Sequence, residues 1–280
     1  MKIAMTLLCR DEADVLADWI EYHVSKGVDY LVVTDNGSRD GSAELLREYE
    51  KSGRVFLFEE ASYTHDQATW VSRMANFAIR DLNADWLLHS DADEFWWCDE
   101  PSMHDVLGEC PVSVQALRVE RSNFLPPVED LQSREGAFWT RQLRRQLKSV
   151  NSLGKPLPPK VCHRKAENVW VEDGNHSVRV AGHPLTAAES RSLRILHFPI
   201  RSYQQFERKI RQGTEALYRN TRIAPGVGQT WRFTYENYLS KSRLRDYYDE
   251  LSAASGVGYV IDTRLRDYMV GRYGGTGSLS

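Results

Sequence analysis

The first ninety residues alternate between short apolar runs and amphipathic segments, and this alternation constrains the fold more than any other feature of the sequence. The amphipathic segments repeat apolar residues at helical spacing, and the third extends from about Gln67 to Leu82. The apolar runs have the length of buried strands and lie at residues 3–8, 30–34, 55–58 and from residue 86 onward. Strands that alternate with helices form parallel sheets with right-handed crossovers. The N-terminal half therefore predicts an α/β fold, a mostly parallel sheet flanked by helices.

The second half of the chain is less regular. Pro126-Pro127 and Pro158-Pro159 lie in a stretch where we expect loops. Patterns of apolar residues predict strands at 112–119, 169–171 and 193–196, and helices at 202–219 and 234–251. We expect one α/β domain over residues 1–200, with a C-terminal helical subdomain over residues 201–280 packed on it.

Composition excludes several classes of function. The chain has 280 residues, of which 41% are hydrophobic and 27% are charged, as in ordinary soluble domains. Its net charge of −3 gives no electrostatic case for binding nucleic acid. The four cysteines are scattered without a Cys-x-x-Cys pair, which favours reduced thiols in a cytoplasmic compartment over disulfides or a zinc knuckle.

Hydropathy gives no sign of a membrane-spanning segment. No apolar run reaches the ~18 residues that a transmembrane helix needs. The apolar run at residues 3–8 is too short for a signal peptide before Arg10, and it fits a first buried strand better. We therefore expect a cytoplasmic protein without a transmembrane segment. Whether the C-terminal helices contact a membrane surface is left open.

One apolar run ends abruptly in acidic residues. The stretch Trp86 to Ser90 is followed by Asp91, Asp93 and Glu94. Two aspartates two positions apart at the end of a strand can turn toward one ion, and Mg²⁺ and Mn²⁺ prefer such oxygen ligands. Open α/β sheets bind ligands at this edge. The motif therefore indicates a metal–diphosphate site, with a solvated acidic turn as the alternative.

Other charged residues follow the neighbouring strands. Arg10 comes after the first strand, Asp35 after the second, and Arg73 lies on the third helix. Because the carboxyl ends of parallel strands meet at one edge, these groups converge with the acidic motif. Arginines for phosphate, an aspartate for a base N–H and two metal carboxylates can hold a nucleoside diphosphate. The glycine patterns of dinucleotide-binding and P-loop proteins are missing from the sequence.

Four N-terminal motifs carry a resemblance to a known family. In order and spacing they resemble the N-terminal half of family 2 glycosyltransferases of the GT-A fold, especially the bacterial branch whose metal motif reads Asp-x-Asp-Glu-Phe. The resemblance covers about residues 1–100, with weaker similarity at 174–178 and 197–206. The motifs are Thr6 to Glu12, Val33 to Ser42, Arg73 with Asn76, and Asp91 to Phe95.

This resemblance implies a role for each matching residue. Asp35 would contact the nucleobase, usually uracil, and Arg10 and Arg73 would line the nucleotide. Asp91 would contact the ribose or the metal, and Asp93 would bind Mn²⁺ or Mg²⁺ directly. A late histidine often completes such a metal site. We expect this ligand to be His197, with His176 as the alternative.

The implied activity is metal-dependent hexosyl transfer with inversion at the anomeric carbon. A nucleotide-diphosphate sugar, expected to be a UDP-sugar, would donate to a hydroxyl of a glycan or a lipid-linked acceptor. The attacking hydroxyl needs a general base. Asp173 is the favoured base, and Glu172, His176 and Glu94 remain alternatives. Candidate cations for the diphosphate are Lys160, Arg164, Arg201 and Lys209.

Two other functions remain open. A sugar-phosphate nucleotidyltransferase would use a related sheet, although it would carry a glycine-rich loop ending in arginine, which does not follow the first strand here. A non-catalytic module that binds nucleotide sugars would keep the pocket without turnover. The nature of the released product separates these functions from sugar transfer.

Overall fold

A computed structural model describes residues 1–61, 66–128, 137–219 and 226–273. The chain forms two compact units. The first consists of residues 1–121 and 158–195, and the second of residues 122–157 and 196–280. Residues 122–157, which we expected in the first domain, therefore belong with the C-terminal segment. Within the described residues, no helix has both the length and the hydropathy needed to cross a membrane.

A seven-stranded sheet forms the centre of the first unit, in the order β13-β6-β9-β4-β1-β2-β3. The neighbours β4, β1, β2 and β3 are parallel, whereas β9 runs antiparallel to both β4 and β6. The mostly parallel sheet that the sequence predicts is confirmed. The strands are β1 (Ile3–Cys9), β2 (Tyr30–Asp35), β3 (Val55–Glu59), β4 (Trp86–Ser90), β6 (Ala116–Val119), β9 (Lys160–Arg164) and β13 (Ala188–Glu189).

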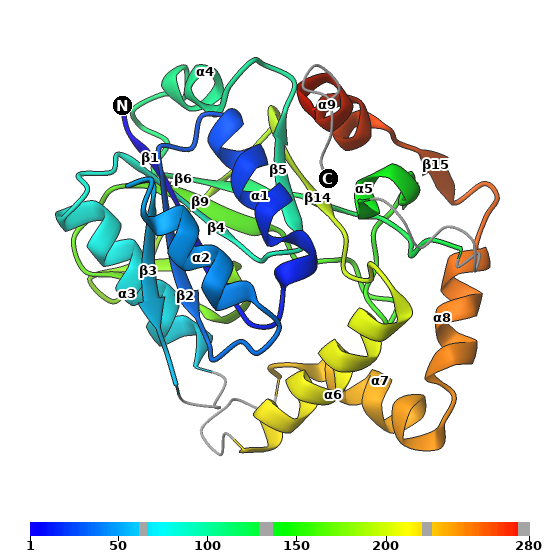
Figure 1. Cartoon of the computed structure of the whole chain (residues 1–280). Coiled ribbons are helices and arrows are strands. Elements are labelled where there is room, and N and C mark those ends of the chain that lie inside the picture. Colours follow the sequence, from blue (N-terminus) through cyan, green and yellow to red (C-terminus); the bar gives the residue numbers. More distant parts are fainter. Residues whose placement is uncertain (62–65, 129–136, 220–225, 274–280) are drawn as a thin grey trace. The chain divides into compact units, whose positions relative to one another are not determined.

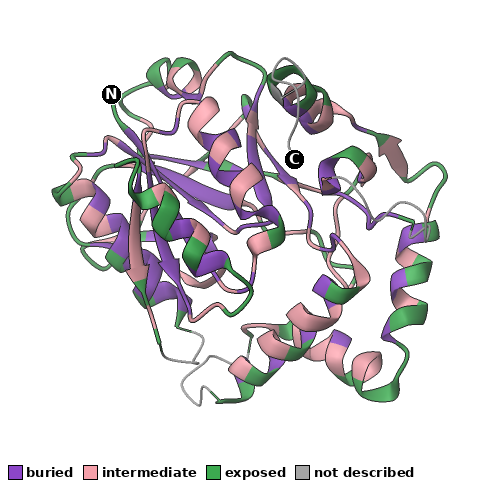
Figure 2. Ribbon diagram, in the orientation of Figure 1, coloured by how far each residue is buried: buried purple, intermediate pink, exposed green. Residues whose placement is uncertain are grey.

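Helices cover both faces of this sheet (Figure 1). On one face, α3 (Gln67–Arg80) packs Val71, Met74 and Ala78 against sheet residues that include Ala4 and Leu87. Because side chains alternate along a strand, the neighbouring positions of β1 face the other way. That face is covered by α1 (Ala13–Ser25) and α2 (Ser42–Glu50). Figure 2 shows that β1, β2 and β4 are buried along almost their whole length.

Side chains of α3 fasten a second, small sheet to the first unit. Asn76 pairs with both backbone groups of Val169, donating to its oxygen at 2.7 Å and accepting from its nitrogen at 3.2 Å. Ser72 Oγ accepts from the Val171 nitrogen at 2.8 Å. The helix thereby satisfies backbone groups of an edge strand that would otherwise be unpaired. The small sheet contains β10 (Val169–Val171), β11 (Val178–Val180) and β12 (His183–Pro184).

Helices dominate the second unit. Its core joins Phe206 and Ile210 of α6 to Leu244 and Tyr248 of α8. Arg145 and Arg264 both pair with the carboxylate of Asp262, each at 2.6 Å. Its elements are α5 (Phe138–Arg141), β8 (Arg144–Gln146), α6 (Tyr203–Arg219), α7 (Gln229–Asn237), α8 (Leu244–Ala253), β15 (Tyr259–Ile261) and α9 (Arg264–Tyr273). The remaining elements of the chain are β5 (Glu94–Cys98), α4 (Met103–Gly108), β7 (Arg121–Asn123) and β14 (Leu193–His197).

Two expected elements differ in the structure. The single helix expected over 234–251 is two helices, because the chain breaks at Ser242, whose φ of 56° is not helical. The strand β9 lies where we expected loops. Its sequence Lys-Val-Cys-His-Arg lacks a run of apolar residues, yet both of its neighbours bury it. This strand carries Lys160 to the sheet edge where β4 ends.

Candidate functional site

The carboxyl ends of β1, β2 and β4 lie side by side. Cys9 is in register with Asp35, and Leu7 with Ser90. Arg10 therefore follows β1 at the edge where β2 ends in Asp35 and where β4 runs into Asp91. The expected convergence of these strand ends is present in the backbone register.

Asp35 ends β2 with one carboxylate oxygen in use. Its Oδ2 accepts from the nitrogen of Ser38 at 3.1 Å, which closes the turn after the strand. Asp11 braces this turn from the β1 side, since its Oδ1 accepts from the Arg39 nitrogen at 2.7 Å. Asp35 is only 4% exposed, and its Oδ1 has no hydrogen-bond partner among the described residues. A buried, unpaired carboxylate oxygen is unfavourable by about 1–3 kcal/mol, so this atom is suited to a donor from a ligand.

Arg73 reaches the same edge from α3. Its guanidinium lies 5.0 Å from the centre of the Phe58 ring and 4.0 Å from the Glu60 carboxylate. The backbone nitrogen of Glu60 in turn donates to the oxygen of Asp35 at 2.9 Å. The side chain is 42% exposed, which leaves it accessible to a ligand at this edge.

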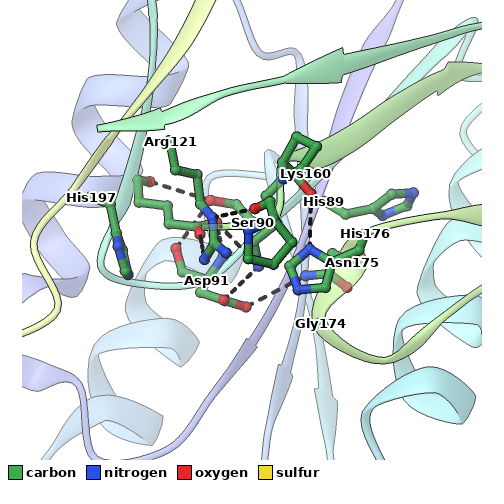
Figure 3. Close-up of polar contacts among 12 residues, drawn as sticks. His89, Ser90, Asp91, Arg121, Lys160, Gly174, Asn175, His176 and His197 are labelled. Atoms are coloured by element: carbon green, nitrogen blue, oxygen red, sulfur yellow. Dashed lines mark hydrogen bonds and ion pairs between the residues drawn. The ribbon is translucent and has the colours of Figure 1, made fainter. Parts of the chain in front are cut away.

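A charged cluster follows β4 (Figure 3). The ammonium of Lys160 lies 2.6 Å from Oδ2 of Asp91 and 3.4 Å from Oε2 of Glu94. Arg121 contacts the other oxygen of Glu94 at 3.3 Å. The nitrogen of Asp91 also donates to Oε2 of Glu94, at 3.2 Å. Glu94, which is fully buried, is thus held between two cations, as a buried carboxylate requires.

Charge sets the ionisation of Asp91. Burial raises its pKa, but the positive charge of Lys160 opposes this and lowers the pKa below the ordinary value. Asp93 follows two residues later and is only 2% exposed. Its negative charge acts on Asp91 in the opposite sense to Lys160. Asp91 is therefore ionised at neutral pH, with one oxygen occupied by an ammonium.

The direction of β9 explains why Lys160 is at this site. Because β9 runs antiparallel to β4, its first residue lies toward the carboxyl end of β4, and its last residue, Arg164, is in register with Trp86 at the opposite end. Arg164 donates there to the oxygens of Cys110 at 2.7 Å and Val114 at 3.0 Å. Arg164 therefore lies at the opposite end of the strand from the acidic motif, against our expectation that it could bind the diphosphate, whereas Lys160 lies beside that motif.

The segment from Glu172 to His176 borders the cluster. Asn175 donates to Oδ1 of Asp91 at 3.4 Å, and its own Oδ1 lacks a hydrogen-bond partner within the described part of the chain. Asn175 has a φ of 60° and follows Gly174, whose φ is 76°. This unusual backbone sets the directions of the Asn175 and His176 side chains. A Cβ on Gly174 would lie 2.5 Å from Nε2 of His176.

Three of the four candidate bases lie in this segment, and their environments differ. Asp173 Oδ1 accepts from the nitrogen of Ala68 at 3.1 Å, in the first turn of α3. Glu172 forms an ion pair with Arg179 at 2.5 Å on the surface. His176 Nδ1 donates to the oxygen of Pro159 at 2.8 Å. Burial, and then the charges of Lys160 and Arg121, lower the pKa of His176 to about 4. The ring is therefore neutral at pH 7, with the lone pair on Nε2.

His197 lies in the second unit, at the end of β14. Its Nδ1 is 2.5 Å from Oδ1 of Asn123, which belongs to the same unit. Its role as a metal ligand stays a prediction.

The donor set of the first unit suits a hard divalent cation. Carboxylate oxygens of Asp91 and Asp93 and the amide oxygen of Asn175 are the ligand types that Mg²⁺ and Mn²⁺ prefer. The unpartnered Oδ1 of Asn175 is an atom that such an ion would satisfy. The residues present therefore fit the expected metal.

Two members of the site were missed from the sequence. Arg121 and Asn175 were not among the candidates, although Asn175 lies in the stretch 174–178 that carries weak family similarity. Asparagine tolerates positive φ better than most residues other than glycine, and this is the one local signal that could have identified it. Arg121 gave no signal, because its partner Glu94 is distant in the sequence.

The comparison with protein families assigns the chain. The model of glycosyltransferase family 92 matches residues 5–253, which include most of β1, the acidic motif and the Glu172–His176 segment. The chain belongs to glycosyltransferase family 92. The expectation of a glycosyltransferase is confirmed, while the family is 92 where the N-terminal motifs had suggested family 2. The matched range extends through most of the second unit, so the family 92 assignment covers both units of the chain.

Solved structures resemble the family 92 chain distantly. Staphylococcus aureus TarS 1-349 is 10% identical with a TM-score of 0.43, over 76% of this chain and 65% of that one. The same TarS fragment in complex with UDP-GlcNAc is 8% identical with a TM-score of 0.44, over 80% of this chain and 68% of that one. The mannosyltransferase PcManGT from Pyrobaculum calidifontis, in complex with GDP-Man and Mn²⁺, is 12% identical with a TM-score of 0.39. The match covers 99% of this chain and 81% of that one. No curated protein matches the chain.

Proposed function

We propose that this family 92 member transfers a sugar from a nucleoside diphosphate sugar, most simply a UDP-sugar, to a hydroxyl of a glycan or lipid-linked acceptor. The observation that carries the proposal is that one sheet edge holds both a buried carboxylate oxygen with no hydrogen-bond partner among the described residues and an acidic cluster of the kind that binds metal ions. The first is Asp35 and the second contains Asp91 and Asp93. Family membership supports the reaction type.

The nucleoside would bind at the ends of β1 and β2. An N–H of the base, as in uracil, would donate to Oδ1 of Asp35 and satisfy this buried atom. The turn is braced by Asp11, so the carboxylate is held ready before the ligand arrives. Arg10 and Arg73 would face the nucleotide's negative charge from the neighbouring elements.

The diphosphate would lie beside the acidic cluster. Asp93, with Asp91 and Asn175, would hold Mn²⁺ or Mg²⁺, and His197 would be a further ligand. The ion would neutralise the departing diphosphate. Lys160 and Arg121 supply positive charge of the protein's own to the same cluster.

Inversion would follow from a single displacement. The acceptor oxygen forms a bond to the anomeric carbon as the bond from that carbon to the diphosphate oxygen breaks. The hydroxyl proton passes to a base of the segment Glu172–His176. Asp173 is the proposed base, because α3 engages its Oδ1 and the second oxygen of the carboxylate can take the proton. His176, neutral with a lone pair on Nε2, is the alternative.

Product analysis tests this proposal. A panel of UDP- and GDP-sugars is incubated with the protein and Mn²⁺ or EDTA, and the released nucleotide is identified by chromatography. We expect free nucleoside diphosphate, lost with EDTA and reduced at least 100-fold in Asp93→Asn. The matched control Asp81→Asn, an exposed residue after α3, should keep full activity. Formation of pyrophosphate from a nucleoside triphosphate and a sugar 1-phosphate, in a parallel incubation, would instead indicate a nucleotidyltransferase. No turnover of any donor would contradict the proposal.

A further inference from the structure

Lys160 places a buried ammonium against the first aspartate of the acidic motif. Its side chain is 1% exposed, and its nearest carboxylate oxygen is Oδ2 of Asp91 at 2.6 Å. The second carboxylate, Glu94, lies farther away at 3.4 Å and also has Arg121 at 3.3 Å from its other oxygen. Lys160 is therefore mainly the counter-ion of Asp91 (Figure 3).

This contact occupies an atom that a metal would use. A divalent cation that approaches Oδ2 of Asp91 meets a positive charge at hydrogen-bond distance, and like charges this close repel each other. The ammonium cannot simply give up its partner, because a buried charge without a counter-ion is costly. An anion must replace Asp91 as the partner of Lys160 before the metal can bind fully.

We propose that Lys160 couples the binding of the metal to the binding of the nucleotide. In the nucleotide-free protein it neutralises Asp91 and keeps the affinity for a divalent cation low. When a nucleoside diphosphate binds, its phosphate oxygens take over the ammonium, and Asp91 becomes available to the ion. This inference rests on the proposed function and deepens it.

The coupling has a thermodynamic signature. If UDP raises the affinity for Mn²⁺ by some factor, Mn²⁺ must raise the affinity for UDP by the same factor. Removal of the ammonium has opposite effects on the affinity for Mn²⁺ alone and on the affinity for UDP. Mn²⁺ alone gains a free carboxylate and loses a repulsive charge, whereas UDP loses a cation that would bind its diphosphate.

Lys160→Met tests the proposal, because methionine fills a similar volume without charge. Binding of Mn²⁺ without nucleotide is followed by electron paramagnetic resonance, and binding of UDP at saturating Mn²⁺ by calorimetry. We expect the affinity for Mn²⁺ alone to rise at least tenfold and the affinity for UDP to fall at least tenfold. The matched control is Lys165→Met, which removes a half-exposed lysine paired with Asp85 at 2.8 Å, and it should change both affinities less than twofold.

The outcomes separate this inference from a structural role. If both affinities fall in Lys160→Met, or if neither changes, the inference is overturned while nucleotide binding by the wild-type protein still supports the proposed function. If the variant does not fold, measurements on the wild-type protein test the inference. Equal affinity for Mn²⁺ with and without UDP overturns it, and an affinity for Mn²⁺ that is at least tenfold higher with UDP supports it. Failure of the wild-type protein to bind any nucleotide with Mn²⁺ would overturn the proposed function itself.

Discussion

At the scale of single residues, the site is built from carboxylates whose surroundings differ. Asp35 has one buried oxygen that finds no hydrogen-bond partner in the described part of the chain, Asp91 is paired with a buried lysine, and Glu94 is enclosed by two cations. In the proposed function the same side-chain chemistry would serve three purposes, namely ligand recognition, metal binding and structural support. Environment, and not residue type, separates these roles.

Asp173→Asn tests the proposed base without breaking the fold. The asparagine oxygen can still accept from the nitrogen of Ala68, so α3 keeps this contact. We expect turnover to fall by about 10²–10⁴-fold, the range of general base catalysis, with the affinity for nucleotide changed less than threefold. Steady-state kinetics and nucleotide titration measure the two quantities.

His176→Asn is the companion variant. Asparagine can place its Nδ2 where Nδ1 of the histidine donates to Pro159, but it lacks the Nε2 lone pair. A larger loss of turnover in this variant than in Asp173→Asn would move the base to His176.

At the scale of elements, a short turn with unusual backbone borders the charged cluster and would form the acceptor side of the proposed site. Gly174 and Asn175 both have positive φ, and a side chain on Gly174 would collide with His176. The turn is also tied to α3, since the nitrogen of Gly174 donates to Oε1 of Gln67 at 2.8 Å. Its geometry is therefore determined by contacts on both sides.

A pair of glycine substitutions isolates this effect. Gly174 and Gly182 both have positive φ, but a Cβ on Gly182 would have nothing within 4 Å. Alanine at either position should cost about 1–2 kcal/mol of stability from backbone strain. We expect only Gly174→Ala to lose turnover, by at least tenfold, because only there is His176 displaced. Chemical unfolding and kinetics of the two variants make the comparison, and equal activities would contradict it.

Elements with local signals could be predicted from the sequence, and those defined by distant partners could not. Asp35 and Asp91 each follow an apolar run, so their position at one edge follows from the alternation of strands and helices. The strand β9 has no such run, since its sequence includes a lysine and a histidine. It is buried by two strands that are distant in the sequence, β4 and β6. The placement of Lys160 opposite Asp91 depended on that strand's direction, which local patterns do not encode.

At the scale of the whole molecule, buried histidines link the core of the first unit to pH. Nε2 of His89 is 3.1 Å from Nε2 of His163, whose Nδ1 donates to the oxygen of Arg164. With Thr6 donating to Nδ1 of His89 at 2.8 Å, neutral rings satisfy all these hydrogen bonds. On α1, burial lowers the pKa of His23 to about 3, and burial likewise lowers that of His163 to about 4.

These histidines predict acid lability of the first unit. Their folded pKa values lie below the ordinary value near 6.5, so the unfolded chain binds more protons between about pH 6.5 and 4. The contribution of these histidines to the free energy of unfolding is therefore fully present above about pH 6.5 and is lost as the pH decreases. Near pH 5, protonation of His23 and His163 in the unfolded chain makes the free energy of unfolding fall by up to about 2.7 kcal/mol for each pH unit.

Urea unfolding followed by tryptophan fluorescence at pH 7, 6 and 5 measures this slope. Substitution of His183, which is exposed on β12, should leave it unchanged. A free energy of unfolding that stays constant from pH 7 to pH 5 would show that these histidines are not buried in neutral form.

The central claim is that a metal nucleotide binds where β1, β2 and β4 end. The most direct measurement is anomalous diffraction from crystals grown with Mn²⁺ and UDP. We predict a manganese peak within coordination distance of Asp93, with the uracil against Asp35. A manganese peak away from Asp93, or nucleotide density at another edge of the sheet, would contradict the account.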